Sequence, residues 1–340
     1  MTRRNVSRPS AQSEPTMAEP IGAIGTAYPH SAGDPSTSPP NLPRDLSAAS
    51  ALRWAVRTLA GARVDTPRLD AELLLCQALK WTRARLYAHP EHTLSEGEHA
   101  HFLRLVRRRT TREPLAYLLG RKEFYGLEFL VDRRVLIPRP ETELLVELAI
   151  RRLEDIQSVQ PAPAVVDVGT GSGAIAIALA RHSSAITVHA LDVSADALDV
   201  ARANCYRHGV TARVGLLRGD LLAPLENPVD LLVGNLPYVT RAELDALPPE
   251  ISTYEPRVAL DGGADGLDVL RRLLGQAEEY LRPHGGILLE IGAEQSAEAR
   301  ALAARHFPAA MIQVHRDLSD LDRILEIDTA TPGGGQPGDL

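Results

Sequence analysis

From Ala164 onward the chain alternates short apolar runs with helical stretches, and this pattern more than any other limits the folds open to it. Strands that alternate with helices form a parallel, doubly wound sheet. The last two apolar runs, Met311–His315 and Arg323–Ile327, are too close for a crossover helix, so we expect them to pair antiparallel. The predicted elements before that hairpin are strands at Val165–Val168, Ile186–Leu191, Arg213–Leu217, Val229–Val233 and Gly286–Ile291, and helices near Ala174–Arg181, Ala195–His208 and Leu267–Leu281.

The rest of the chain shows other patterns. Leu46 to Gly120 carries only helical signals, among them Thr66-Pro67 as an N-cap before a first-turn proline, and Ser95 with Glu98 at capping-box spacing. Lys122 to Val131 is strand-like around a central glycine, which predicts a two-stranded connector. The chain therefore divides into a disordered leader (1–45), a small helical domain (46–120), a β-hairpin connector (121–137), an α/β domain (138–328) and a frayed tail (329–340).

Composition excludes several classes of protein. Residues 1–45 hold eight prolines and little apolar surface, which predicts disorder, and Met17 within them is a possible true start. The two cysteines, Cys76 and Cys205, form no CxxC pattern, so we expect neither a disulfide framework nor a metal site. The net charge of -7 disfavours general polyanion binding. Since the chain shows no apolar membrane-spanning run and no signal-like start, we expect a cytoplasmic protein with no membrane partner.

A glycine-rich segment follows the first strand of the α/β pattern and opens a helix. Asp167-Val168-Gly169-Thr170-Gly171-Ser172-Gly173-Ala174 has three alternating glycines, which allow a tight turn and a close approach of a ligand to the backbone. A strand-to-helix turn without a ligand is the alternative, but three glycines at a strand's carboxyl end favour binding. The spacing also satisfies the dinucleotide pattern, so the loop alone does not identify the ligand.

Two aspartates end the next two strands and lie at the same predicted edge of the sheet. Asp192 can accept hydrogen bonds from both ribose hydroxyls of a nucleoside; the alternative role of helix N-cap suits Ser194 better. Asp220 can hold an adenine amino group or can be a solvated turn residue, and the sequence does not separate these two readings.

The segment after the fourth strand, Gly234-Asn235-Leu236-Pro237-Tyr238-Val239, suits a planar amide or amine. The side-chain oxygen of Asn235 can accept one N–H, and the backbone carbonyl of Leu236 can accept the other, because Pro237 keeps the preceding residue extended. The ring of Tyr238 can cover the planar group. An ordinary turn is the alternative, but a place after strand four, in register with the glycine loop, favours a site.

These motifs resemble a known family. Asp167 to Gly173 resembles the S-adenosylmethionine loop of Rossmann-like methyltransferases, and Asn235 to Tyr238 resembles their Asn-Pro-Pro-Tyr acceptor motif, with Leu236 in place of the first Pro. The chain from about 46 to 328 resembles the bacterial peptide chain release factor glutamine methyltransferases. The segments that carry this wider resemblance are Arg112–Gly120, Lys122–Gly126, Val135–Glu147 and Tyr254–Gly263.

The resemblance implies a class I S-adenosyl-L-methionine-dependent fold and a protein-(glutamine N5) methyltransferase that uses S-adenosyl-L-methionine and releases S-adenosyl-L-homocysteine. Its substrate would be the Gln of the Gly-Gly-Gln motif in class-1 peptide chain release factors, with the helical domain recognising the substrate, and we expect a monomer that does not act on nucleic acid. Asn235, the Leu236 carbonyl, Pro237 and Tyr238 would hold the acceptor. The implied cofactor-binding residues are Gly169, Thr170, Gly171, Ser172, Gly173, Asp192, Asp220, Leu221 and Asn235.

Four other functions and two other segments remain open from the sequence. A ribosomal-protein glutamine methyltransferase would share the acceptor chemistry, a DNA adenine methyltransferase would need to grip phosphates, and an NAD-dependent oxidoreductase or a binding module would leave Asn235 unexplained. Arg139 suits a structural link, and the role of Glu141 stays undecided. The basic run Arg104–Arg112 is interpreted as a solvated helix face, with contact to an acidic surface of the release factor as the alternative.

Overall fold

The structure, a computed structural model, describes residues 47–329. The predicted leader and nearly all of the predicted tail lie outside these described residues. Within the described range, no helix is both long enough and apolar enough to cross a membrane.

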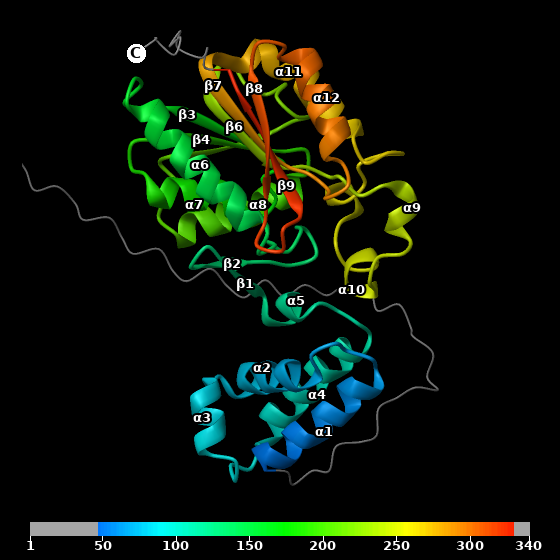
Figure 1. Ribbon diagram of the computed structural model, residues 1–340. Coiled ribbons are helices and arrows are strands. Elements are labelled where there is room, and N and C mark those ends of the chain that lie inside the picture. The colour runs from blue at the N-terminus through cyan, green and yellow to red at the C-terminus, as the bar shows by residue number, and fades with distance from the viewer. Residues whose placement is uncertain (1–46, 330–340) are drawn as a thin grey trace, which may run out of the picture. The chain divides into compact units, whose positions relative to one another are not determined.

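The N-terminal part of the described chain is helical, as predicted, and packs around its own core. Trp54, Leu74, Leu75 and Phe102 are among the buried residues of that core. Figure 1 shows the four longest of these helices gathered together in blue and cyan. The helices are α1 (Ala48–Gly61), α2 (Pro67–Leu79), α3 (Arg83–Ala88), α4 (Glu96–Thr110) and α5 (Leu115–Leu119).

The two capping predictions in this part have different outcomes. Ser95 and Glu98 form the predicted capping box at the start of α4. Thr66 occupies the N-cap position of α2, but its side chain does not cap the helix. Its hydroxyl instead donates to Oδ1 of Asp70 at 2.7 Å. The local pattern therefore predicted the start of α2 correctly. The Thr66 hydroxyl, however, binds the buried carboxylate of Asp70 in the same helix and does not cap the helix.

The β-hairpin and the sheet confirm the predicted fold class. Strands β1 (Arg121–Phe124) and β2 (Leu127–Leu130) pair antiparallel across Gly126. The main sheet has seven strands in the order β5-β4-β3-β6-β7-β9-β8 and is parallel except for β9, which runs antiparallel to both of its neighbours. Its strands are β3 (Ala164–Val168), β4 (Thr187–Asp192), β5 (Val214–Arg218), β6 (Val229–Asn235), β7 (Leu281–Glu290), β8 (Met311–Arg316) and β9 (Asp322–Asp328).

Helices cover both faces of this sheet (Figure 1). Residues of α6 (Thr142–Gln157), α7 (Ala174–His182) and α8 (Ala195–Arg207) share one apolar core with β3 and β4. Residues of α11 (Asp268–Tyr280) and α12 (Ser296–His306) share the second core with β6 and β7. The sequence pattern predicts α7, α8 and α11 but neither α6 nor α12. The connection from β6 to α11 carries the short helices α9 (Arg241–Leu244) and α10 (Pro249–Ser252) and a 3₁₀ turn at Arg257–Ala259.

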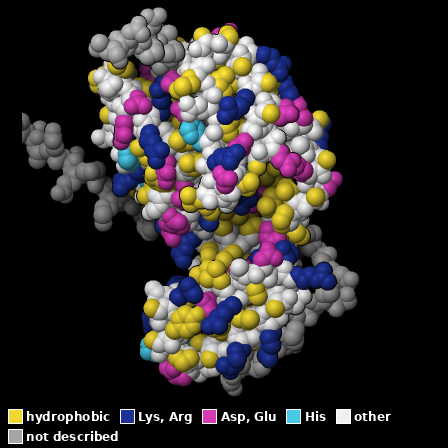
Figure 2. All heavy atoms as spheres, in the orientation of Figure 1, with side chains coloured by type: hydrophobic (Ala, Val, Ile, Leu, Met, Phe, Trp, Pro, Cys, Tyr) yellow, Lys and Arg dark blue, Asp and Glu magenta, His cyan; other side chains and the backbone are white. Residues whose placement is uncertain are grey.

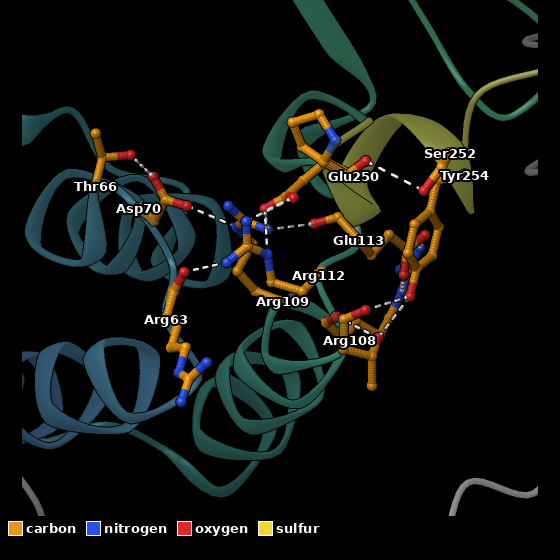
Figure 3. Close-up of polar contacts among 12 residues, drawn as sticks. Arg63, Thr66, Asp70, Arg108, Arg109, Arg112, Glu113, Glu250, Ser252 and Tyr254 are labelled. Carbon is orange, nitrogen blue, oxygen red and sulfur yellow. Dashed lines mark hydrogen bonds and ion pairs between the residues drawn. The ribbon is translucent and has the colours of Figure 1, made fainter. Parts of the chain in front are cut away.

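The basic run at the end of α4 is only partly solvated, which corrects the expectation that it forms an exposed face. Arg104, Arg107 and Arg108 are exposed, but Arg109 is only 5% exposed. Nε of Arg109 lies 2.6 Å from Oδ2 of Asp70, and its Nη1 lies 3.0 Å from Oε1 of Glu250 in α10 (Figure 3). Periodicity does not reveal this burial, because the two acidic partners lie 39 residues before Arg109 and 141 residues after it.

Two neighbours of Arg109 also have acidic partners. Arg112 contacts Glu250 at 2.6 Å, and Arg108 contacts the buried carboxylate of Glu113 at 2.7 Å (Figure 3). Although burial alone would raise it, hydrogen bonds from Arg112 and Arg109 hold the pKa of Glu250 below its ordinary value. Glu250 therefore stays charged at neutral pH and ties the end of α4 to the segment that follows β6.

Candidate active site

A cavity of about 270 Å³ opens at the carboxyl ends of β3, β4, β5 and β6. The strand order reverses between β3 and β6, and such a switch point is where α/β sheets of this kind bind ligands. The sheet therefore brings the glycine loop, the two aspartates and the acceptor segment to one place, as the sequence predicts. The predicted residues that line the cavity are Gly169, Gly171, Asp192, Asp220, Leu221, Asn235, Leu236 and Pro237.

The glycine loop presents backbone, rather than side chains, to the cavity. Gly169, Gly171 and Gly173 have φ values of 74°, 54° and 82°, in the left-handed region that favours glycine. The hydroxyl of Thr170 donates to Oδ2 of buried Asp167 at 2.7 Å, and Ser172 is only 3% exposed. Thr170, Ser172 and Gly173 are not among the residues that line the cavity.

Asp192 joins the glycine loop to the end of β4. Its Oδ2 accepts from the backbone N–H of Gly171 and its Oδ1 from that of Ser194, both at 2.9 Å. Ser194 is the N-cap of α8, as the sequence predicts. Burial raises the pKa of Asp192, against the lowering effect of the backbone hydrogen bonds from Ser194 and Gly171. The carboxylate is thus held in a fixed position at the cavity wall, with lone pairs left for a ligand hydroxyl.

Asp220 and Leu221 line the same wall in different ways. The Asp220 carboxylate is exposed and forms an ion pair with Arg272, which lines the cavity too. Leu221 is buried, with a φ of 52° that is unusual for leucine. The neighbouring side chain of Arg272, at the start of α11, is a lining residue that the sequence analysis did not anticipate.

Asn235 ends β6 at the cavity and is oriented by a neighbour from another element. Its Nδ2 donates to Oγ1 of Thr142, the first residue of α6, at 3.1 Å. None of the described residues donates to its Oδ1. The amide oxygen is therefore available to accept an N–H, as the sequence analysis expects.

The rest of the acceptor segment is packed and braced. Leu236 is only 5% exposed and belongs to the same apolar core as Val168, so an apolar side chain fits where the Asn-Pro-Pro-Tyr motif that this segment resembles has proline. Tyr238 is not a lining residue; its hydroxyl donates to Oε1 of Glu290 at 3.2 Å. The Tyr238 carbonyl accepts from Nε2 of Gln295 at 2.9 Å.

The glycine loop and the acceptor segment touch each other. A Cβ added to Gly234 would lie 2.8 Å from the carbonyl oxygen of Val168, and one added to Gly169 would lie 3.8 Å from that of Asn235. Only glycine fits at Gly234 without a shift of this backbone. This close packing places the glycine loop directly beside the Asn235 segment at the cavity.

Arg139 braces the wall of the cavity, in agreement with a structural role. Its guanidinium contacts Oε1 of buried Glu255 at 2.6 Å, and Oε2 of that carboxylate accepts from the N–H of Ile137 at 3.3 Å. Because the Pro-Arg-Pro segment and the segment of Glu255 hold each other, they keep Val135, Leu136 and Pro256 at the cavity. Within residues 47–329, no group of three or more His, Cys, Asp or Glu side chains is placed to hold a metal ion.

Comparison with known proteins agrees with the two-part architecture. The family model of the PrmC N-terminal domain matches residues 50–120, and that of the methyltransferase small domain matches residues 146–247. The release factor glutamine methyltransferase of Nitratidesulfovibrio vulgaris is 42% identical over 278 residues, which cover 81% of this chain and 92% of the relative. That of Moorella thermoacetica is 44% identical over 259 residues, covering 76% and 90%.

Among solved structures, a methyltransferase from Pyrococcus furiosus is similar with a TM-score of 0.44 and 16% identity, over 62% of this chain and 92% of that one. The sequence relatives are far more similar and are matched over almost their whole length. By this similarity, the chain belongs to the release factor glutamine methyltransferase family.

Proposed function

We propose that this protein transfers the methyl group of S-adenosyl-L-methionine to the side-chain amide nitrogen of the Gln in the Gly-Gly-Gln motif of class-1 peptide chain release factors. The observation that carries this proposal is Asn235, whose amide nitrogen is tied to Thr142 while its Oδ1 stays available at the cavity. A primary amide has two N–H groups to donate. An oxygen acceptor beside a glycine loop suits such a substrate.

The residues at the cavity fit S-adenosyl-L-methionine. Gly169 and Gly171 offer backbone that a ligand can approach closely, and Asp192 offers a fixed carboxylate for ribose hydroxyls. The apolar side chains of Leu221 and Val193 suit a flat base. When bound, the cofactor supplies a methyl group attached to a positively charged sulfur.

The protein's own contribution to the reaction is orientation and electrostatic stabilisation. The lone pair of an amide nitrogen is delocalised into its carbonyl, which makes the nitrogen a poor nucleophile. Asn235 Oδ1 and the Leu236 carbonyl would accept the two N–H groups and stabilise the positive charge that develops on nitrogen. Holding the reactants in place contributes about 7 kcal/mol or more in ideal cases. The proton is acidic only after transfer and can leave to solvent, so this mechanism needs no dedicated base.

Replacing Asp192 with alanine should raise the dissociation constant of the cofactor about tenfold to hundredfold, because hydrogen bonds to a charged group are lost. Isothermal titration calorimetry with S-adenosyl-L-homocysteine measures this effect. Asp196→Ala, four residues away on the exposed start of α8, is the matched control and should bind like the wild type. An unchanged constant in Asp192→Ala would remove Asp192 from the site.

The net charge of -7 favours a protein substrate over nucleic acid. On the face in Figure 2, basic and acidic side chains are interspersed over the α/β part, whereas the helical part shows mainly basic side chains. A release factor is a cytoplasmic substrate, and we propose that the protein acts there as a monomer.

One labelling experiment tests the function. The wild-type protein is incubated with radiolabelled S-adenosyl-L-methionine and with release factor, ribosomal protein or DNA in separate reactions. We expect label on the release factor only, mapped by mass spectrometry to the Gln of Gly-Gly-Gln, and no label on a release factor with that Gln replaced by Ala. Label on the ribosomal protein or on DNA alone would contradict the proposal.

A further inference from the structure

Asn235 and Glu290 lie opposite each other at the ends of neighbouring strands. They are paired in the parallel register of β6 and β7, which places their side chains on the same face of the sheet. Glu290 is only 3% exposed, so its charge must be satisfied inside the protein. Its Oε2 accepts from the Thr142 hydroxyl at 2.6 Å, and its Oε1 accepts from the Tyr238 hydroxyl at 3.2 Å. The Thr142 hydroxyl thus links the Glu290 carboxylate to the Asn235 amide.

The direction of these hydrogen bonds follows from the chemistry of the groups. An ionised carboxylate can only accept, so the Thr142 hydroxyl proton points to Glu290. The lone pairs of Thr142 Oγ1 then face Asn235, and the group of Asn235 that satisfies them is the Nδ2 amino group. Because the amide is planar, its Oδ1 is turned away from Thr142.

From this chain of contacts we infer that Thr142 and Glu290 are positioning residues, which hold the Asn235 amide so that Oδ1 rather than Nδ2 meets the substrate amide. The inference rests on the proposed function, because it concerns how Asn235 accepts the N–H group of the substrate amide. In this role Thr142 and Glu290 touch neither the substrate amide nor the cofactor, and they act only through Asn235.

The need for such a device lies in the near symmetry of the asparagine side chain. A rotation of 180° exchanges Oδ1 and Nδ2 with almost no change in shape. The rotated amide would present N–H groups to the N–H groups of the substrate, so the acceptor would be lost and a repulsion added. The hydrogen bond from Asn235 Nδ2 to Thr142 Oγ1, whose direction is fixed by Glu290, prevents this rotation.

The charge state of Glu290 sets the direction of the whole chain. Burial raises the pKa of Glu290, opposed by hydrogen bonds from Thr142 and Tyr238 and by the charge of Arg323, while Glu141 raises it further. A protonated Glu290 can donate to Thr142, which can then donate to Asn235 and favour the rotated amide. Activity therefore requires the ionised form and falls as the pH drops through a pKa above the ordinary value for Glu.

Two substitutions at Thr142 test the inference. Thr142→Val keeps the shape and removes the hydroxyl, and we expect kcat to fall about tenfold to hundredfold. The KM for the release factor and the dissociation constant of S-adenosyl-L-homocysteine should stay within about threefold, because binding surfaces are unchanged. Thr142→Ser restores the hydroxyl and should recover most of kcat. Thr187→Val, at the exposed start of β4, is the control for a threonine-to-valine exchange outside the site.

Glu290→Gln provides the second readout. In glutamine an NH₂ group replaces one of the two carboxylate oxygens, so one of the two hydroxyls loses the oxygen that accepts from it. The amide does not titrate, so the acid limb of the kcat profile should be abolished. Since Glu290 acts through Thr142, the Thr142→Val/Glu290→Gln double variant should be no slower than Thr142→Val alone.

Each result bears on the inference separately from the function. Full kcat in Thr142→Val, equal losses in Thr142→Val and Thr142→Ser, or additive losses in the double variant would overturn the positioning role. Failure of the wild type to label a release factor would instead overturn the proposed function. If Glu290→Gln does not fold, the kcat values of Thr142→Val and Thr142→Ser and the acid limb of the wild-type pH profile still test the positioning role.

Discussion

Replacing Asn235 with alanine should lower kcat for methyl transfer about 10²- to 10³-fold or more, the usual loss when one group that stabilises a transition-state charge is removed. The Leu236 carbonyl would remain as a single acceptor, so the substrate nitrogen would be held by one N–H only. The amide of Asn235 lies at the end of β6, where its removal leaves the apolar core unchanged. Single-turnover assays on a release factor measure the loss.

The controls for this variant separate chemistry from binding. The dissociation constant of S-adenosyl-L-homocysteine should change little in Asn235→Ala, because the glycine loop and Asp192 are intact. Asn227→Ala, at an exposed position of the loop before β6, is the matched control and should keep full activity. Undiminished turnover in Asn235→Ala would refute its assignment as the acceptor.

Replacing Arg109 with glutamine should lower the free energy of unfolding of the helical region by about 3–5 kcal/mol, because it leaves a buried carboxylate without its partner. Arg109 contacts Asp70, which is 2% exposed, and Glu250, and its Nη1 also donates to the carbonyl of Glu113 at 3.2 Å (Figure 3). Glutamine cannot reach and neutralise both acids. The Arg109→Gln substitution should therefore lower stability more than the same substitution at any exposed arginine of this run.

Arg107→Gln is the matched control, two residues away on the same helix. Arg107 is exposed, so its replacement should change stability by less than about 0.5 kcal/mol. Both tryptophans of the chain, Trp54 and Trp81, lie in the helical region, so their fluorescence in urea follows the unfolding of that region. Equal midpoints for the two variants would show that the Arg109 contacts contribute no stability.

The same network predicts a dependence on pH. The pKa of Glu250 is lower in the folded protein than its ordinary value, so its ion pairs stabilise the fold above that ordinary value. This contribution should be lost as the pH falls through the folded-state pKa, below about 4.5. A Glu250→Gln variant should show a smaller change in urea midpoint between pH 7 and pH 4 than the wild type.

Much of the candidate site follows from local sequence rules. Three glycines at a strand end require a tight turn, Ser194 caps α8, and parallel strands deliver Asp192, Asp220 and Asn235 to one edge of the sheet. These predictions need only the alternation of strands and helices and the fact that parallel strands share their carboxyl edge. That is why the sequence correctly predicts a cavity where these segments meet.

Other features depend on contacts between distant segments, and no local rule anticipates them. Thr142 reaches Glu290 across 148 residues, and Arg109 reaches Glu250 across 141. Glu290 is visible in the sequence only as a charged residue that closes an apolar run, and Thr170 as a hydroxyl that could equally have faced the ligand. The roles of Glu290 and Thr170 depend on the side chains that they contact, and these contacts form only when the segments are buried together.

By itself, then, the sequence determined the fold class and the edge of the sheet where the cavity opens, and it predicted the kind of group that we propose for that cavity, because periodicity, turn geometry and side-chain chemistry are local properties. The tertiary structure alone decided which side chains face the cavity, which arginine is buried and how the Asn235 amide is turned. These depend on the desolvation of charges, which arises only when distant segments pack together.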